Sequence, residues 1–188
     1  MISQTLTLKK NNITDFAKER NTILKKAKSD WVIFLDSDEV LSNALKKEIE
    51  NLDPGDFNGF YIRRENYFLR QHIGTDKILR LGKANSGKWV RRVHETWKIK
   101  GKVGELNNPI IHNSAKSLHE MIAKINNYST LHALANKEEG KRSNIFKIKF
   151  FPKLKFWESV LMGRGVTFSI LQAFHSFLSW SKLYFSRS

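Results

Sequence analysis

Residues 31–39 have the sequence WVIFLDSDE, in which five consecutive apolar residues are followed by a polar turn with three carboxylates. A short apolar run with helical sequence on both sides is typical of a buried strand in a parallel sheet. In open α/β sheets, ligands bind outside the carboxyl ends of the strands. The segment therefore predicts an α/β fold with a polar site directly after this strand.

Helical periodicity flanks the predicted strand on both sides. Before it, apolar residues recur at helical spacing over residues 15–28, and Thr14 is a candidate N-cap with an acid in the first turn. After it, a second helix is expected over residues 42–51, ending before a Pro-Gly turn. Further strands are expected at residues 59–64 and 78–81, and a long helix at residues 118–139.

Composition narrows the class of protein. The chain has 188 residues, 40% of them hydrophobic, which is enough for a buried core. It contains no cysteine, which excludes disulfide scaffolds and Cys-ligated zinc and fits a reducing compartment. The formal net charge of +15 predicts a polyanionic partner, either nucleic acid, an anionic membrane face or a phosphorylated substrate.

The positive charge is concentrated near the C-terminus. Residues 141–188 contain nine Lys and Arg residues and one acid, and residues 145–185 hold 11 of the 22 aromatic residues. We therefore expect a domain over residues 1–140 and a basic-aromatic tail over residues 141–188, with Pro152 interrupting the tail. The apolar run at residues 166–180 is shorter than the ~20 residues that a transmembrane helix needs.

Three interpretations of the tail remain open. Bulky apolar residues with flanking cations are typical of an element that lies in the membrane interface, here on an anionic surface. A helical hairpin packed on the preceding domain would have a similar composition. Interleaved basic and aromatic residues also bind single-stranded nucleic acid by stacking. The upstream acidic turn would repel phosphates unless a cation lies there, so we expect no nucleic-acid partner.

The acidic turn contains a candidate cation site. Asp36 and Asp38 are two residues apart, so both carboxylates can face one ion where the chain is extended. Oxygen ligands of this kind suit Mg²⁺ or Mn²⁺, and such a cation would hold a diphosphate. The alternative is that one of these residues only caps the following helix.

Two segments, DFAKERN at residues 15–21 and DWVIFLDSDE at residues 30–39, resemble family 2 glycosyltransferases. Within that family the chain most resembles bacterial enzymes that add sugars to lipopolysaccharide core or similar surface glycans. The resemblance continues in order through residues 64–68, 76–81, 93–95, 104–106, 111–112 and 124–129, so it spans about residues 14–140. It implies a partial GT-A fold, a Rossmann-like mixed sheet with flanking helices, followed by a helical, basic-aromatic appendage.

The resemblance also implies the activity and its cation. The expected reaction is inverting transfer of a sugar, of hexosyl or heptosyl type, from a nucleotide-sugar donor to a glycolipid or lipopolysaccharide acceptor. Asp36 and Asp38 match the DxD motif, whose Mg²⁺ or Mn²⁺ bridges the donor diphosphate. His112 is at the position of a late histidine ligand, although a satisfied histidine near a strand end is an equal alternative.

The same resemblance gives candidates for the remaining roles. Glu95 is the best match to the base that takes a proton from the acceptor hydroxyl, and Asp76 is the second candidate. Arg80 is a candidate for binding a donor phosphate, and a structural ion pair is the alternative.

The N-terminal segment leads to a further expectation. Residues 2–8 resemble the first strand of the family but are joined almost directly to the helix at Asp15. We therefore expect the strands that grip the base and ribose to be missing, and the chain alone to be a poor or inactive transferase. The alternative function is a catalytically incomplete relic or an acceptor- and membrane-binding module. The expected location is cytoplasmic, on the cytoplasmic face of the inner membrane.

Overall fold

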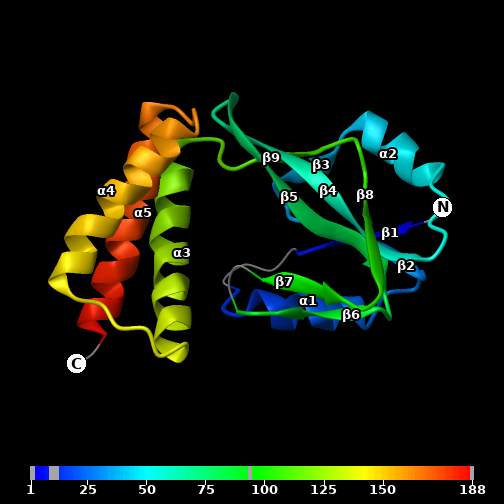
Figure 1. Cartoon of the computed structure of the whole chain (residues 1–188), viewed down its shortest axis with the longest axis horizontal. Helices are drawn as coiled ribbons and strands as arrows, with labels where there is room; N and C mark the ends of the chain where they lie inside the picture. The colour runs from blue at the N-terminus through cyan, green and yellow to red at the C-terminus, as the bar shows by residue number, and fades with distance from the viewer. Residues whose placement is uncertain (1–2, 9–12, 93–94, 187–188) are drawn as a thin grey trace. The chain divides into compact units, whose positions relative to one another are not determined.

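The computed structural model describes residues 3–8, 13–92 and 95–186 (Figure 1). The chain divides into two compact units. Unit 1 comprises Met1–Asn66 and Thr75–Asn113, and unit 2 comprises Tyr67–Gly74 and Ser114–Ser188.

Unit 1 is built on a seven-stranded mixed sheet with the order β1-β2-β5-β4-β9-β3 and with β8 paired to β4. The strands are β1 (Ser3–Thr7), β2 (Trp31–Leu35), β3 (Glu39–Leu41), β4 (Phe57–Phe68), β5 (Gln71–Lys83), β8 (Lys102–Glu105) and β9 (Ile110–Asn113). β2 is parallel to β1 and antiparallel to β5, so the expectation of a parallel sheet around β2 holds for one neighbour only. The predicted α/β class is confirmed, with the strands expected at residues 59–64 and 78–81 lying inside the longer β4 and β5.

Two helices and a hairpin complete unit 1 (Figure 1): α1 (Phe16–Leu24), α2 (Asn43–Glu50), and the pair β6 (Gly87–Val90) and β7 (Thr96–Ile99). Ser42 caps α2 as the predicted start requires. The cap of α1 is Asp15 rather than Thr14, because the Asp15 carboxylate accepts from the Lys18 backbone N–H at 2.9 Å. α1 also ends at Leu24 instead of residue 28. After Leu24 the backbone hydrogen bonds join residues three apart, as in a 3₁₀ turn; for example, the Ala27 N–H donates to the Leu24 carbonyl oxygen.

The unbroken apolar character of β2 follows from its place between two hydrophobic clusters. Trp31, Ile33 and Leu35 belong to one cluster, which includes Leu45 and Ile49 of α2. The alternate residues, Val32 and Phe34, belong to a second cluster with side chains from α1 and the β6–β7 hairpin. Both faces of β2 are therefore covered, and the strand ends directly at the acidic turn.

Unit 2 consists of α3 (Leu118–Glu138), α4 (Ile145–Leu161) and α5 (Val166–Phe185) with the tip of the β4–β5 hairpin. Its core comprises Phe68, Ile73, Ala115, Met121, Ile125, Phe168 and Leu171. α3 belongs to the same unit as α4 and α5, because it packs against α5, and the expected domain of residues 1–140 with a tail stays a prediction. α4 and α5 thus pack together as a helical pair, and α5 packs on α3, the helix that precedes the tail.

Pro152 does not interrupt α4, contrary to the expectation from sequence. Proline removes one backbone donor from a helix, but the neighbouring side chains still anchor the turn here. Phe151 stacks on Trp180 of α5 with ring centroids 5.0 Å apart. Among the residues that the structure describes, no helix is long and apolar enough to cross a membrane.

Candidate functional site

The acidic turn after β2 is closed by two reciprocal hydrogen bonds. The Glu39 backbone N–H donates to the Asp36 carbonyl oxygen at 3.0 Å, and the Asp36 N–H donates to Glu39 Oε2 at 2.9 Å. Glu39 is buried and begins β3. The turn therefore holds the Asp36 carboxylate at the carboxyl end of β2, where the sequence predicted a polar site.

Arg20 links the turn to a distant carboxylate. Its Nη2 donates to Asp36 Oδ1 at 2.6 Å and its Nε donates to Glu95 Oε1 at 2.9 Å. The guanidinium also lies over the Trp89 ring, 4.6 Å from the centroid, and the residue is fully buried. Glu95 and Asp36 are thus brought together by one buried cation.

Arg80 and Arg64 extend these contacts across the sheet. Arg80 Nη2 donates to Asp36 Oδ2 at 2.8 Å and approaches Glu39 Oε1 at 3.3 Å. Arg64 Nη1 donates to the same Glu39 oxygen at 2.9 Å. We call this set the ionic network, and its members are Arg20, Asp36, Glu39, Arg64, Asp76, Arg80 and Glu95.

Asp76 is held at the other end of the ionic network. Arg64 Nε and Nη2 donate to its two carboxylate oxygens at 3.0 and 2.6 Å, which is a bidentate pair. The side-chain amide of Asn66 adds a donor at 3.3 Å from Asp76 Oδ1. Both Asp76 oxygens therefore accept hydrogen bonds from within the protein.

The pKa values of Asp36 and Asp76 reflect these cations. Burial alone would raise the pKa of Asp36, but the charges of Arg80 and Arg20 and the hydrogen bond from Arg20 hold it below the ordinary value of 3.8. Burial likewise opposes ionisation of Asp76, and the hydrogen bonds and charge of Arg64 keep its pKa below 3.8. Both groups are carboxylates at neutral pH.

His112 and Asp38 lie beside the ionic network. Because the Asn66 amide nitrogen donates to Asp76, its oxygen faces His112 Nδ1, 2.7 Å away. Nδ1 must then carry the imidazole proton in this contact, which leaves Nε2 directed to Asp38 Oδ1 at 3.6 Å. Either a protonated imidazole or a cation shared by the two groups would satisfy this arrangement.

The donors fit a divalent cation only in part. Asp38 Oδ1 and His112 Nε2 can contact one ion together, since their 3.6 Å separation is less than twice a metal–oxygen distance of ~2.1 Å. Both oxygens of Asp36 accept hydrogen bonds from arginines instead. Within the described part of the chain, no group of three or more His, Asp or Glu side chains is arranged to hold a metal. Asp38 and His112 would therefore need oxygens from a bound ligand.

The structure places the predicted residues close together. Asp36, Asp76, Arg80 and Glu95 are members of the ionic network, and Asp38 and His112 adjoin it through Asn66. Arg80 makes the contacts of a structural ion pair with Asp36 and Glu39, and phosphate binding by Arg80 stays a prediction. His94, in the matching segment at residues 93–95, lies outside the described residues.

Sequence reasoning gave no role to Arg20, Glu39, Arg64 or Asn66. Arg20 had a detectable signal, because it falls between Ala17 and Leu24 on the apolar face of α1. A charged residue at such a position must be paired when it is buried. The pairing of Arg64 and Asn66 with Asp76 had no such signal, since it depends on how β4 and β5 align.

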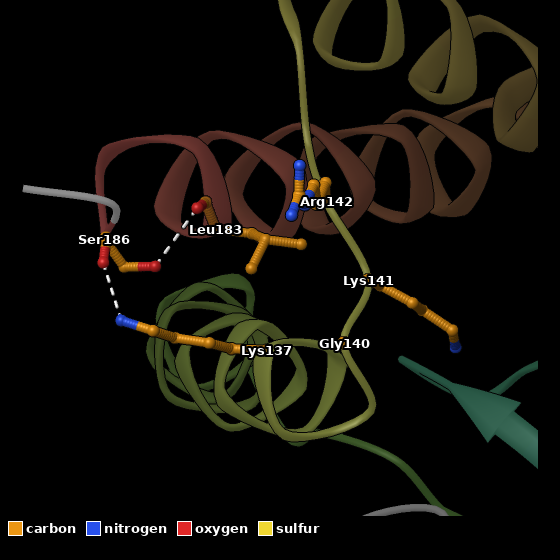
Figure 2. A pocket seen from close by; sticks show the side chains of 6 residues that line it. All are labelled: Lys137, Gly140, Lys141, Arg142, Leu183 and Ser186. Carbon is orange, nitrogen blue, oxygen red and sulfur yellow. Dashed lines mark hydrogen bonds between the residues drawn. The ribbon is translucent and has the colours of Figure 1, made fainter.

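A separate pocket of about 420 Å³ lies in unit 2 and contains none of these residues (Figure 2). It is lined by Lys137, Gly140, Lys141, Arg142, Leu183 and Ser186. Lys137 Nζ donates to the Ser186 carbonyl oxygen at 2.7 Å, and Ser186 Oγ donates to the Leu183 carbonyl oxygen at 3.1 Å. Lys141 is paired with Glu139 at 2.7 Å, so part of the positive charge around this pocket is already balanced.

Comparisons with known proteins show the family of the chain. The family model for glycosyl transferase family 2 matches residues 5–103, a region that includes the whole ionic network but not His112. A lipopolysaccharide core biosynthesis glycosyltransferase of Rhizobium meliloti, LpsC, is 26% identical, over 90% of this chain and 69% of its own length. An uncharacterized glycosyltransferase of Rickettsia conorii is 25% identical, over 82% of this chain and 64% of its own length. The chain thus spans about two thirds of the length of these relatives.

Proposed function

The chain belongs to glycosyl transferase family 2, and we propose that it transfers a sugar with inversion from a nucleotide-sugar donor to a lipopolysaccharide or other surface-glycan acceptor. The observation that supports this most is the contact of Arg20 with both Glu95 and Asp36. It fixes a candidate base against the turn at the carboxyl end of β2, where α/β folds bind phosphorylated ligands. The acceptor class rests on the similarity to LpsC, whose name refers to lipopolysaccharide core biosynthesis.

Glu95 is better suited than Asp76 to act as the base. One of its oxygens accepts from Arg20, and no other hydrogen bond to it comes from the described residues. Asp76 has both oxygens bound and a lowered pKa, so it accepts a proton less readily. We therefore assign to Glu95 the removal of the proton from the acceptor hydroxyl as this oxygen attacks the anomeric carbon.

Asp38 and His112 would hold Mg²⁺ or Mn²⁺ together with oxygens of the donor diphosphate. When bound, the cation offsets the negative charge that develops on the departing nucleoside diphosphate. His112 is oriented for this role by Asn66, which fixes the imidazole proton on Nδ1. Asp36 would not contact the cation itself. It would hold Arg20 and Arg80 at the end of β2.

A specific observation favours one alternative function. Both Asp36 oxygens accept hydrogen bonds from arginines, so the first carboxylate of the DxD match is already paired with positive charge and attracts a cation less strongly in this arrangement. An acceptor- or membrane-binding relative without transferase activity would tolerate such an arrangement. The two functions differ in whether a nucleotide sugar binds in a manner that depends on Mn²⁺.

Calorimetry with several nucleotide sugars, with and without Mn²⁺, tests the proposed function. We expect at least one donor to bind more tightly with Mn²⁺ and this gain to disappear in Asp38→Ala. Asp53→Ala, which removes an exposed carboxylate outside the ionic network, is the matched control. If no donor binds in either condition, the chain is a binding module and the transferase proposal is wrong.

A further inference from the structure

α4 is one of the two helices that pack against α5 in unit 2. It packs along α5, and α5 in turn packs against α3 (Figure 1). The contact with α5 includes the stacked rings of Phe151 and Trp180. The opposite side of α4 is exposed over its 17 residues, which corresponds to a length of about 25 Å.

The exposed side of α4 carries a continuous row of large apolar side chains. We call it the α4 stripe, and its members are Phe146, Phe150, Leu154, Trp157 and Leu161. They recur every three or four residues and so share one face of the helix. Their exposed fractions run from 43% for Phe150 to 85% for Leu161. Water-soluble surfaces rarely present such a row without a binding partner.

Two lysines border the α4 stripe on one side. Lys149 and Lys153 are three residues after Phe146 and Phe150, so each lies on the adjacent ridge of the helix. Both are exposed, and the described residues offer neither of them an ion pair. Other lysines of α4 are engaged within the unit, since Lys147 lies over the Trp180 ring and Lys155 pairs with Glu158.

We propose that the α4 stripe, with Lys149 and Lys153, docks onto the surface of an anionic lipid bilayer with α4 lying in the plane of the interface. Aromatic rings and long aliphatic stems suit the boundary between head groups and acyl chains, and the two ammonium groups suit anionic head groups. A second copy of the chain fits this face poorly. A two-fold interface would bring the same lysines of two copies together, in a segment with nine cations and one acid.

This inference rests on the proposed function only for the choice of an anionic bilayer as partner. Vesicle binding is measured without donor, acceptor or cation, so its failure would leave the transferase assignment untouched. The probe is flotation of the full chain with vesicles of equimolar phosphatidylglycerol and phosphatidylcholine, compared with vesicles of phosphatidylcholine alone. We expect binding to the anionic vesicles that weakens as salt is added.

Two double variants of α4, each with a matched control, test the lysines and the apolar side chains of the α4 stripe separately. Lys149→Gln with Lys153→Gln should weaken binding roughly fivefold for each charge removed. Lys46→Gln with Lys47→Gln, an equal charge change on exposed residues of α2, should leave binding unchanged. Phe150→Ser with Trp157→Ser should weaken binding roughly tenfold or more, because apolar burial is lost. Leu118→Ser with Ile122→Ser, at exposed positions of α3, is the matched control.

The depth of α4 in the bilayer is measured by quenching of tryptophan fluorescence with brominated lipids. We expect partial quenching in the wild type, since Trp157 is one of five tryptophans, and loss of most of this quenching in Trp157→Phe, which keeps the apolar stripe. The inference is overturned if the full chain ignores anionic vesicles at low salt, or if both α4 variants bind as well as their controls. It is equally overturned if Phe150→Ser with Trp157→Ser instead dissociates a dimer in sedimentation, since the stripe would then bind a second copy.

Discussion

Arg20 Nε lies 2.9 Å from Glu95 Oε1, although 75 positions separate the two residues in the sequence. Arg20 is buried and the Glu95 side chain is 14% exposed, so the pair is largely removed from water. The same guanidinium binds Asp36 at 2.6 Å. A candidate base and the turn after β2 are therefore positioned by one side chain.

Arg20→Ala should destabilise unit 1 by about 3 kcal/mol, because it leaves Asp36 and Glu95 in a partly buried site without their cation. Urea unfolding at neutral pH measures the change. Arg63→Ala is the control, since Arg63 is half exposed and lies 3.6 Å from its acidic partner, and it should cost no more than about 1 kcal/mol. Equal losses in the two variants would contradict a structural role of Arg20.

The free energy of unfolding should fall in acid in a way that depends on Asp36 and Asp76. The pKa values of both groups are lower in the folded chain than the ordinary value of 3.8. Their contribution to the free energy of unfolding is therefore fully present above pH 3.8. It is lost as pH falls from there through the folded pKa values. Denaturant titrations between neutral pH and pH ~3 should therefore show a smaller decrease for Asp36→Asn with Asp76→Asn than for the wild type. An unchanged acid slope in the double variant would show that these ion pairs do not form in solution.

His112→Ala should weaken Mn²⁺ binding in the presence of a nucleotide sugar, by roughly tenfold or more, because it removes one of the two protein ligands. Asn66→Ala should weaken it less, since Asn66 only orients the imidazole. Electron paramagnetic resonance of free Mn²⁺ gives both affinities. His119→Ala, at an exposed position in α3, should have no effect. Tight Mn²⁺ binding by His112→Ala would remove His112 from the site.

Local sequence was sufficient to predict β2, the acidic turn after it and the helices around it. In these elements the signal is local, in the apolar run at residues 31–35, in the capping Ser42 and in the periodicity of α3. The two ends of α1 were misplaced, because Asp15 competes with Thr14 as the cap and the last turn tightens. The packing of α3 on α5 had no signal in the sequence either, since charge composition does not report which helices pack together.

Only those parts of the candidate site that have a local sequence signal could be predicted. A carboxylate after a buried strand can be recognised from sequence alone, and so can a charged residue on an apolar helix face such as Arg20. The partners of these residues depend on contacts between distant segments. Asp36 could not be known to bind two arginines before β5 was placed beside β2, which brings Arg80 to the end of that strand.

The most direct test of the account is the rate of nucleoside diphosphate release from the donor that calorimetry identifies, measured with acceptor and Mn²⁺ for the wild type, Glu95→Gln and Asp76→Asn. Glu95→Gln keeps a hydrogen-bond acceptor for Arg20 but cannot take up the acceptor proton, so the rate should fall roughly 100-fold or more. Asp76→Asn should stay within roughly tenfold of the wild type, since Asp76 serves to hold Arg64. A Glu95→Gln variant as active as the wild type, together with an inactive Asp76→Asn, would contradict the assignment of Glu95 as the base.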